Sequence, residues 1–258
     1  MQKIRLISWN VNGIRSVRAK GHLEALLKDA PFAVCLQETK VQLDQLDGYL
    51  KAPPGYHVYW AFPQRKGYGG VTTFSREEPL GVSYDLGKSG LDMEGRVIAA
   101  EYPWFILFNI YFPNGKASQE RLDYKMAFYD TFLKHADALR KAGKKIIVCG
   151  DVNTAHTEMD IARPKENSKR SGFLPIERAW MDKFVTHGYV DTFRHLHHDA
   201  VEYTWWDLKT GARARNVGWR IDYFFVSEDL IPAVTASFIM KDVMGSDHCP
   251  IALDLKVD

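Results

Sequence analysis

Short, uninterrupted apolar runs recur along the whole chain, and they restrict its fold more than any other feature. A continuous apolar run of this kind is typical of a β-strand that is covered on both faces. We therefore predict strands at Ile4–Trp9, Phe32–Leu36, Val58–Phe62, Gly70–Phe74, Val97–Glu101, Phe105–Tyr111, Ile146–Gly150, Ile221–Val226 and Ile251–Leu255. Their periodicity does not reveal the order in which the strands pair.

Helical periodicity is clearest between Gln119 and Lys141, where apolar residues three or four positions apart form a single stripe. Ser118 is a suitable N-cap for this helix, and Gly143 ends it. We predict two shorter helices at Ile176–Thr186 and Gly21–Lys28. Strands mixed with helices in this way predict an α/β protein in which helices cover the sheets.

Composition excludes several classes of protein. The chain has 258 residues, 46% of them hydrophobic, and no repeat or linker interrupts it, so we expect one domain over residues 1–258. Lys and Arg number 34 against 32 Asp and Glu, so affinity for nucleic acid must come from local patches of charge. Three Cys without framework spacing argue against a secreted disulfide scaffold. With no signal peptide and no apolar segment of membrane length, we predict a monomer in the cytoplasm, or in the nucleus of a eukaryote, without membrane contact.

Polar residues come directly after four of the predicted strands. They are Asn10 and Asn12, Glu38, Tyr111 and Asn114, and Asp151 and Asn153. In layered α/β proteins the strand ends are the places where a rigid scaffold presents reactive groups. We therefore expect these side chains to share one polar basin.

Such a basin suits the hydrolysis of a phosphodiester, which requires charge neutralisation and an oriented nucleophile. Mg²⁺ prefers carboxylate, amide and water oxygens, and Glu38 is a natural ligand for it. Asp151 is positioned to hold or deprotonate a water, and Asn153 lies on the same side of an extended segment and can orient that water.

A second polar segment contains Asp247 and His248, which add a carboxylate and an imidazole donor for a phosphate oxygen. Asp222 can pair with His248 and keep it cationic.

Each of these residues also has an ordinary structural interpretation. Asn10 and Asn12 beside Gly13 are typical turn residues, and Glu38 alone is typical of a surface carboxylate. The cluster His195, His197 and His198 looks at first like a better metal site, but it lacks an acid pair at a strand end, so we interpret it as a solvated loop. The joint occurrence of polar residues at several strand ends favours a catalytic centre.

Five segments together resemble the endonuclease/exonuclease/phosphatase superfamily. They are Trp9-Asn10-Val11-Asn12-Gly13, Leu36-Gln37-Glu38, Tyr111-Phe112-Pro113-Asn114, Gly150-Asp151-Val152-Asn153 and Gly245-Ser246-Asp247-His248-Cys249-Pro250. Two further segments, 162–167 and 216–224, resemble the exonuclease III type of abasic-site (AP) endonuclease. The match extends from residue 3 to about residue 255, in motif order.

The resemblance implies a four-layer α/β sandwich: two packed, mainly antiparallel β-sheets flanked by helices. It implies hydrolysis of the phosphodiester 5′ to an abasic site in duplex DNA, which leaves a 3′-hydroxyl and a 5′-deoxyribose phosphate. It also implies 3′→5′ exonuclease and 3′-phosphodiesterase activities, with Mg²⁺ as the cofactor and Mn²⁺ as an alternative ion.

By the same resemblance, Glu38 is the principal Mg²⁺ ligand and Asp222 pairs with the His248 that contacts the scissile phosphate. Tyr111 and Asn114 line the phosphate. The remaining candidates for the metal are Asn10, Asn12, Asp247, Asp151, Asn153 and His248. Asn12 departs from those relatives that have Asp at this position, which weakens the prediction of a metal there.

Residues that hold DNA are expected in the basic loops 163–170 and 209–220. In the resemblance, Trp205 and Trp219 form the apolar walls of a pocket for an extrahelical sugar, whereas Trp206 suits the core. Lys116 and Lys209 lie where relatives insert side chains into the duplex, and as lysines they suit phosphate contact. The complete set of predicted DNA contacts is Lys116, Arg163, Lys165, Asn167, Trp205, Lys209, Trp219 and Arg220.

Several alternatives stay open at this point. A relative of the same fold could cleave inositol phosphates, lipids or undamaged DNA, or could incise beside uracil and oxidised bases. A silent DNA-binding or redox-signalling relative should lack one of the five central residues, Glu38, Asp151, Asn153, Asp222 and His248, yet all are present. The number of metal ions is also open.

Overall fold

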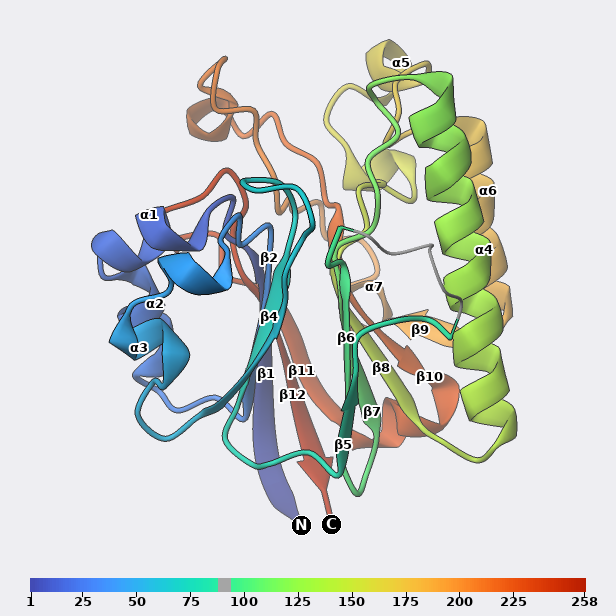
Figure 1. Ribbon diagram of the computed structural model, residues 1–258. Helices are drawn as coiled ribbons and strands as arrows, with labels where there is room; N and C mark the ends of the chain where they lie inside the picture. The colour runs from blue at the N-terminus through green and yellow to red at the C-terminus, as the bar shows by residue number, and fades with distance from the viewer. Residues whose placement is uncertain (88–93) are drawn as a thin grey trace.

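The computed structural model describes residues 1–87 and 94–258, which form two β-sheets packed face to face between helices (Figure 1). The strand order of the first sheet is β11 (Val234–Ile239), β12 (Ile251–Val257), β1 (Gln2–Asn10), β2 (Ala33–Gln37), β4 (Val71–Ser75) and β3 (His57–Ala61). The order of the second is β5 (Gly81–Ser83), β6 (Val97–Glu101), β7 (Ile106–Ile110), β8 (Ile146–Asp151), β10 (Asp222–Ser227) and β9 (Tyr189–Asp191).

The pairing within each described sheet is antiparallel except at one position, β1 with β2 in the first and β7 with β8 in the second. The predicted four-layer α/β sandwich with mainly antiparallel sheets is therefore confirmed. One parallel neighbour in each sheet brings two strand ends to the same edge, which is the edge that carries the polar residues.

The helices divide between the two outer faces (Figure 1). The first sheet is covered by α1 (Ile14–Ala19), α2 (His22–Leu27) and α3 (Gly48–Lys51). The second is covered by α4 (Gln119–Lys141) and α6 (Pro175–Thr186), while α5 (Pro164–Asn167) lies among the loops beyond the sheet and α7 (Thr192–Leu196) lies near β10 and β11. In the described part of the chain, none of these helices combines the length and the apolar character that crossing a membrane requires.

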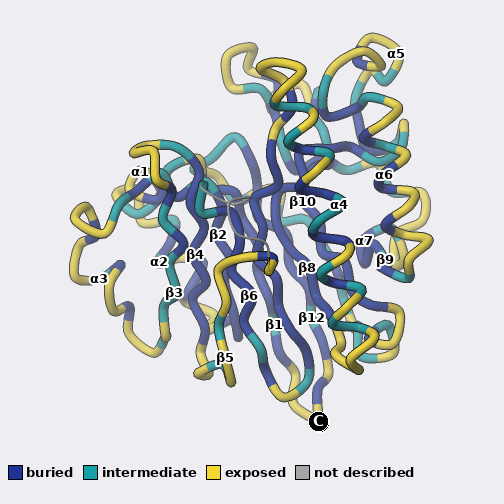
Figure 2. The backbone as a smooth tube through the Cα atoms, turned by 45° about the vertical axis from the view of Figure 1, so that its right-hand side comes forward, coloured by how far each residue is buried: buried dark blue, intermediate teal, exposed yellow. Residues whose placement is uncertain are grey.

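Apolar packing fills all three spaces between the layers, and the central strands of both sheets are buried along most of their length (Figure 2). Leu6 and Phe224 belong to the cluster between the sheets, and Phe108 packs on Phe132 of α4 with ring centroids 5.5 Å apart. Because both faces of each sheet are covered, the strands carry continuous rather than alternating apolar runs.

The long helix α4 has the bounds that periodicity predicts. The Ser118 hydroxyl accepts a hydrogen bond from the Arg121 N–H, as expected of an N-cap, and Gly143 follows the helix with a φ of 82°. Its buried face includes Phe128, Tyr129 and, unexpectedly, Lys125.

The pattern does not predict three strands, β5, β9 and β11, or the short helices α1, α3, α5 and α7. β5 and β9 have three residues each, and β11 is an edge strand with one buried residue, so none of the three shows a continuous apolar run. Helices of four to six residues are too short to display a periodicity.

Candidate active site

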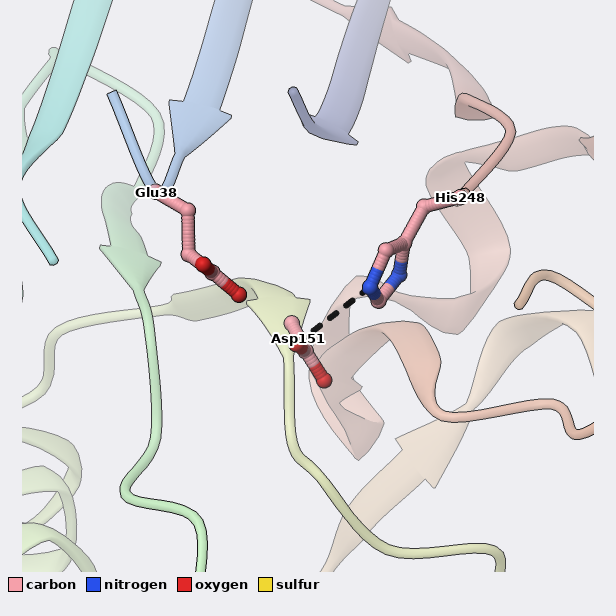
Figure 3. A group of neighbouring side chains, drawn as sticks. All are labelled: Glu38, Asp151 and His248. Carbon is pink, nitrogen blue, oxygen red and sulfur yellow. Dashed lines mark ion pairs between the residues drawn. The ribbon is translucent and has the colours of Figure 1, made fainter. Parts of the chain in front are cut away.

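Three of the predicted residues meet at the polar edge of the two sheets. Glu38 follows β2, Asp151 ends β8, and His248 precedes β12, and Figure 3 shows their side chains converging. One potential ligand atom from each lies within 4.8 Å of the others. The strand-end pattern therefore brings together groups from both sheets.

Several of the site residues have a left-handed backbone, Glu38 and Asn153 among them. Glu38 has a φ of 50° and Asn153 a φ of 55°, a conformation that non-glycine residues adopt at a cost. The Glu38 carbonyl accepts the Gly13 N–H at 2.8 Å, and the Asn153 N–H donates to Asp151 Oδ1 at 2.8 Å. These bonds turn both side chains into the basin.

Asn10 joins the two carboxylates. Its fully buried side chain donates through Nδ2 to Glu38 Oε1 and to Asp151 Oδ2, both at 2.9 Å. Lys40 Nζ lies 2.8 Å from Glu38 Oε2. Burial alone would raise the pKa of Glu38, but Lys40 and Asn10 lower it below its usual value. Sequence reasoning missed Lys40, although its position two residues after Glu38 was a usable signal.

The predicted pairing of Asp222 with His248 is present in the structure. Asp222 Oδ2 lies 2.8 Å from His248 Nδ1 and accepts the Thr204 hydroxyl at 2.6 Å. Burial alone would lower the pKa of His248, but Asp222, with Asp151 and Asp247, raises it to about 10. The imidazole is therefore protonated near neutral pH, which suits a hydrogen-bond donor to an anion better than a metal ligand.

Asp151 is in the opposite electrostatic situation. Its pKa is raised to about 7: burial is the largest cause, the charges of Asp222 and Glu38 add to the rise, and His248 opposes it. The antiparallel register of β8 and β10 places Asp222 directly opposite Asp151, and His248 Nε2 lies 3.9 Å from Asp151 Oδ2. The site thus combines a carboxylate whose pKa is raised to about 7 with an imidazole whose pKa is raised to about 10.

Asn153, Asn114 and Tyr111 line the next part of the basin. Asn153 donates to the Phe112 carbonyl at 2.9 Å and accepts from Asn114 Nδ2 at 3.0 Å, so its amide orientation is determined on both sides. Burial raises the pKa of the Tyr111 hydroxyl well above its usual value, and Glu38 adds to that rise. The hydroxyl therefore stays protonated and can donate a hydrogen bond.

Asp247 and Asn12 form a separate pair beside the central group. Asn12 Nδ2 donates to Asp247 Oδ1 at 2.9 Å, and the Trp205 indole donates to Asp247 Oδ2 at 3.0 Å. Lys40 also donates to Asn12 Oδ1. The oxygens of both predicted ligands thus accept hydrogen bonds from protein donors, as those of Glu38 and Asp151 also do.

A cleft of about 1070 Å³ opens over these residues. The indoles of Trp205 and Trp219 line one wall, with ring centroids 6.0 Å apart and planes at 88°. Trp206 is buried in the core, as predicted. The basic residues that line the cleft are Lys40, Lys116, Arg163, Lys169, Arg170, Lys209 and Arg215.

Two of the predicted DNA contacts, Lys165 and Asn167, differ from the others in position or in hydrogen bonding. Lys165 is exposed on α5 but is not among the residues that line the cleft. Asn167 does line it, but its buried amide donates to the carbonyls of Ala162 and Arg163, so it stabilises the loop.

The prediction that Arg220 contacts DNA is wrong. Its side chain is 1% exposed, its Nε donates to Asp160 Oδ1 at 2.7 Å, and its Nη1 lies 2.8 Å from Asp191 Oδ2. Arg220 lies between the cleft residues Trp219 and Ile221, but the chain turns its side chain into the core. The cluster His195, His197 and His198 is exposed, as expected, although His195 lies in α7 rather than in a loop.

Comparison with known proteins identifies the family. A model described as the Endonuclease/Exonuclease/phosphatase family matches residues 7–248. The chain belongs to this family. An exodeoxyribonuclease of Bacillus subtilis (strain 168) is 44% identical over 256 residues, covering 98% of this chain and 100% of the relative. The DNA repair nuclease APEX1 of Danio rerio is 43% identical over 257 residues, covering 98% and 83% respectively.

Among solved structures, the AP endonuclease LMAP from Leishmania major has a TM-score of 0.90 and 28% identity to this chain, and the match covers 100% of this chain and 89% of that structure. The predicted family and fold are therefore confirmed, and with them the prediction that the chain is an enzyme of the nuclease type.

Proposed function

We propose that this chain is a DNA repair endonuclease that hydrolyses the phosphodiester 5′ to an abasic site in duplex DNA. The products are a 3′-hydroxyl and a 5′-deoxyribose phosphate, and the same site supports 3′→5′ exonuclease and 3′-phosphodiesterase activities. One observation carries the proposal: the Glu38, Asp151 and His248 group lies beneath a cleft that has two indoles in its wall and basic residues around it. The enzyme acts as a monomer in the compartment that contains DNA, the cytoplasm or the eukaryotic nucleus.

The donor set fits a hard divalent cation. Glu38 and Asp151 offer oxygens, and Asn10 bridges them. Burial is the main cause of the raised pKa of Asp151, and the charges of Asp222 and Glu38 add to it, so a cation would lie among several carboxylates. We assign Mg²⁺ to this position, with Mn²⁺ as an alternative ion. When bound, such an ion neutralises phosphate charge and lowers the pKa of a bound water.

The residues of the chain then divide the work of hydrolysis. Asp151 accepts the proton of the attacking water, because its carboxylate lines the cleft 3.9 Å from His248 Nε2 and two residues from Asn153. Asn153, whose amide is fixed by Phe112 and Asn114, orients the water. The protonated His248 donates a hydrogen bond to a phosphate oxygen, and Asp222 keeps it charged and oriented.

The cleft wall provides the preference for damaged DNA. An extrahelical sugar without its base presents an apolar surface, which Trp205 and Trp219 can contact. Lys116, Arg163 and Lys209 lie around the same opening and neutralise backbone phosphates on both sides of the lesion.

A duplex that contains a single abasic analogue tests this proposal. We expect incision 5′ to the analogue in Mg²⁺ and none after EDTA, with an undamaged duplex cut far more slowly. Asp151→Asn is the inactive control. Equal cutting of both duplexes would refute the abasic preference, and cutting beside a single deoxyuridine would extend the damage range.

A further inference from the structure

A fully buried ion pair lies directly behind the candidate active site. Lys125 Nζ of α4 lies 2.6 Å from Glu177 Oε1 in the first turn of α6, and both side chains are 0% exposed. Burial lowers the pKa of Lys125, and the charge of Glu177 opposes that shift. Because desolvation of two charges is costly, such a pair requires hydrogen bonds on every side.

The Lys125 ammonium donates hydrogen bonds to the catalytic loop, by which we mean residues 151–155. Lys125 Nζ donates to the Asn153 carbonyl and to the Thr154 hydroxyl, both at 2.8 Å. With the bond to Glu177, all three of its protons are used. That carbonyl belongs to Asn153, which has a left-handed backbone and whose side-chain amide faces the basin.

The Glu177 carboxylate accepts hydrogen bonds from residues in the wall of the cleft. Glu177 Oε2 accepts the N–H groups of Gly172 at 2.6 Å and Leu174 at 3.0 Å, and Oε1 accepts the Ser171 hydroxyl at 2.9 Å. All three of these residues line the cleft.

Gly172 connects this wall to both the indole and the catalytic loop. Its φ is 97°, and a Cβ there would lie 2.9 Å from Trp219 Cζ3 and 3.3 Å from the Asn153 carbonyl oxygen. Its own carbonyl accepts the Ala155 N–H at 2.8 Å. The position of Gly172 therefore determines where the Trp219 ring lies relative to Asn153.

We infer that Lys125 and Glu177 are a positioning pair, which holds Asn153 and the Gly172 wall in one geometry without touching the substrate. This inference rests on the proposed function, because Asn153 takes its role from it. Docking of α4 on α6 does not need the pair, since the rings of Tyr129 and Trp180 stack 4.1 Å apart and Lys183 pairs with Asp130 between the same helices.

The test compares two variants with wild type. Lys125→Met leaves a buried carboxylate without its partner, whereas the double variant Lys125→Met/Glu177→Leu contains no buried charge and is expected to be more stable than the single one. We expect both to lower kcat roughly 10- to 100-fold on the abasic duplex, with KM changed less than about threefold, because Asn153 is misplaced. Lys183→Met, which breaks the surface pair, is the matched control and should keep the wild-type kcat.

Limited proteolysis provides a measurement that does not depend on activity. Trypsin should cleave after the exposed Lys169 or Arg170 on the order of tenfold faster in the double variant, because the adjacent wall has lost its carboxylate. A double variant with wild-type kcat, or with unchanged cleavage in this loop, would overturn the inference. If wild type fails to cut the abasic duplex, the proposed function fails, and the proteolysis alone decides whether the pair orders the loop.

Discussion

Replacing Arg220 with Met separates a structural arginine from a DNA-binding one. The substitution removes the guanidinium that donates to Asp160 Oδ1 at 2.7 Å and that lies 2.8 Å from Asp191 Oδ2. Both carboxylates are buried, at 0% and 7% exposed. Burial alone would raise the pKa of Asp160, but the guanidinium holds it well below its usual value, so the substitution removes the main group that keeps this buried carboxylate charged.

The magnitude follows from what remains in the variant. Loss of one partner from a buried ion pair costs about 3–5 kcal/mol. Arg194 still lies 2.7 Å from Asp160, and its N–H still donates to Asp191, so we expect the lower end of that range, about 3 kcal/mol. A domain with about 5–15 kcal/mol of stability should survive this loss in the folded state.

The assay is urea unfolding followed by tryptophan fluorescence, together with the salt dependence of DNA binding. Arg215→Met is the matched control, because Arg215 is exposed and lines the cleft. That control should change stability by less than about 0.5 kcal/mol and should reduce the salt slope by about 1. Arg220→Met should leave the slope unchanged. A loss of stability below about 1 kcal/mol, or a reduced slope, would show that the buried-pair reasoning is wrong.

The remaining predictions concern the central group. Asp151→Asn should abolish incision while a gel-shift assay still detects DNA binding, and normal turnover would exclude Asp151 as the proton acceptor. His248→Ala should lower kcat by at least about a hundredfold, and a near-wild-type rate would remove His248 from the site. Glu38→Gln should weaken Mg²⁺ binding in calorimetry, and an unchanged affinity would place the metal elsewhere. The pKa of His248 rises from 6.5 to about 10 on folding, so its pairing with Asp222 stabilises the protein fully below pH 6.5 and loses this effect as the pH rises towards 10. The difference in melting temperature between wild type and Asp222→Asn should therefore shrink between pH 6 and pH 10, and a constant difference would contradict the assigned protonation.

Much of the fold can be predicted from the sequence, because a strand that is buried on both faces appears as a continuous apolar run. β8 reads as a continuous apolar run since helices cover one face of its sheet and the other sheet covers the opposite face. β11 shows no such run, because it lies at an edge of its sheet and its one buried residue is the polar Ser237. Strand order is not local at all: β1 pairs with β12, from the opposite end of the chain.

The site can be predicted from the sequence only where the type of residue indicates its chemistry. Acids and amides at strand ends identify the basin, but Lys125 resembles any other lysine of an amphipathic helix. What distinguishes Lys125 is its position in the helix, because it lies on the buried face with Phe128, Tyr129 and Phe132. The burial of Arg220 could not be predicted from its neighbours in the sequence, because its partners, Asp160 and Asp191, are distant in the sequence.

The two sheets must also keep a fixed offset, because the reacting groups come from both. Glu38 belongs to the first sheet and Asp151 to the second, and apolar surfaces alone do not define how one sheet is placed on the other. Gln37, one residue before Glu38, donates across the interface to Asn109 Oδ1 at 2.8 Å, and Asn109 donates back to the Thr72 carbonyl at 2.8 Å. Such directional bonds in a buried setting permit only one offset, so the polar residues within the core determine the distance between the carboxylates at its edge.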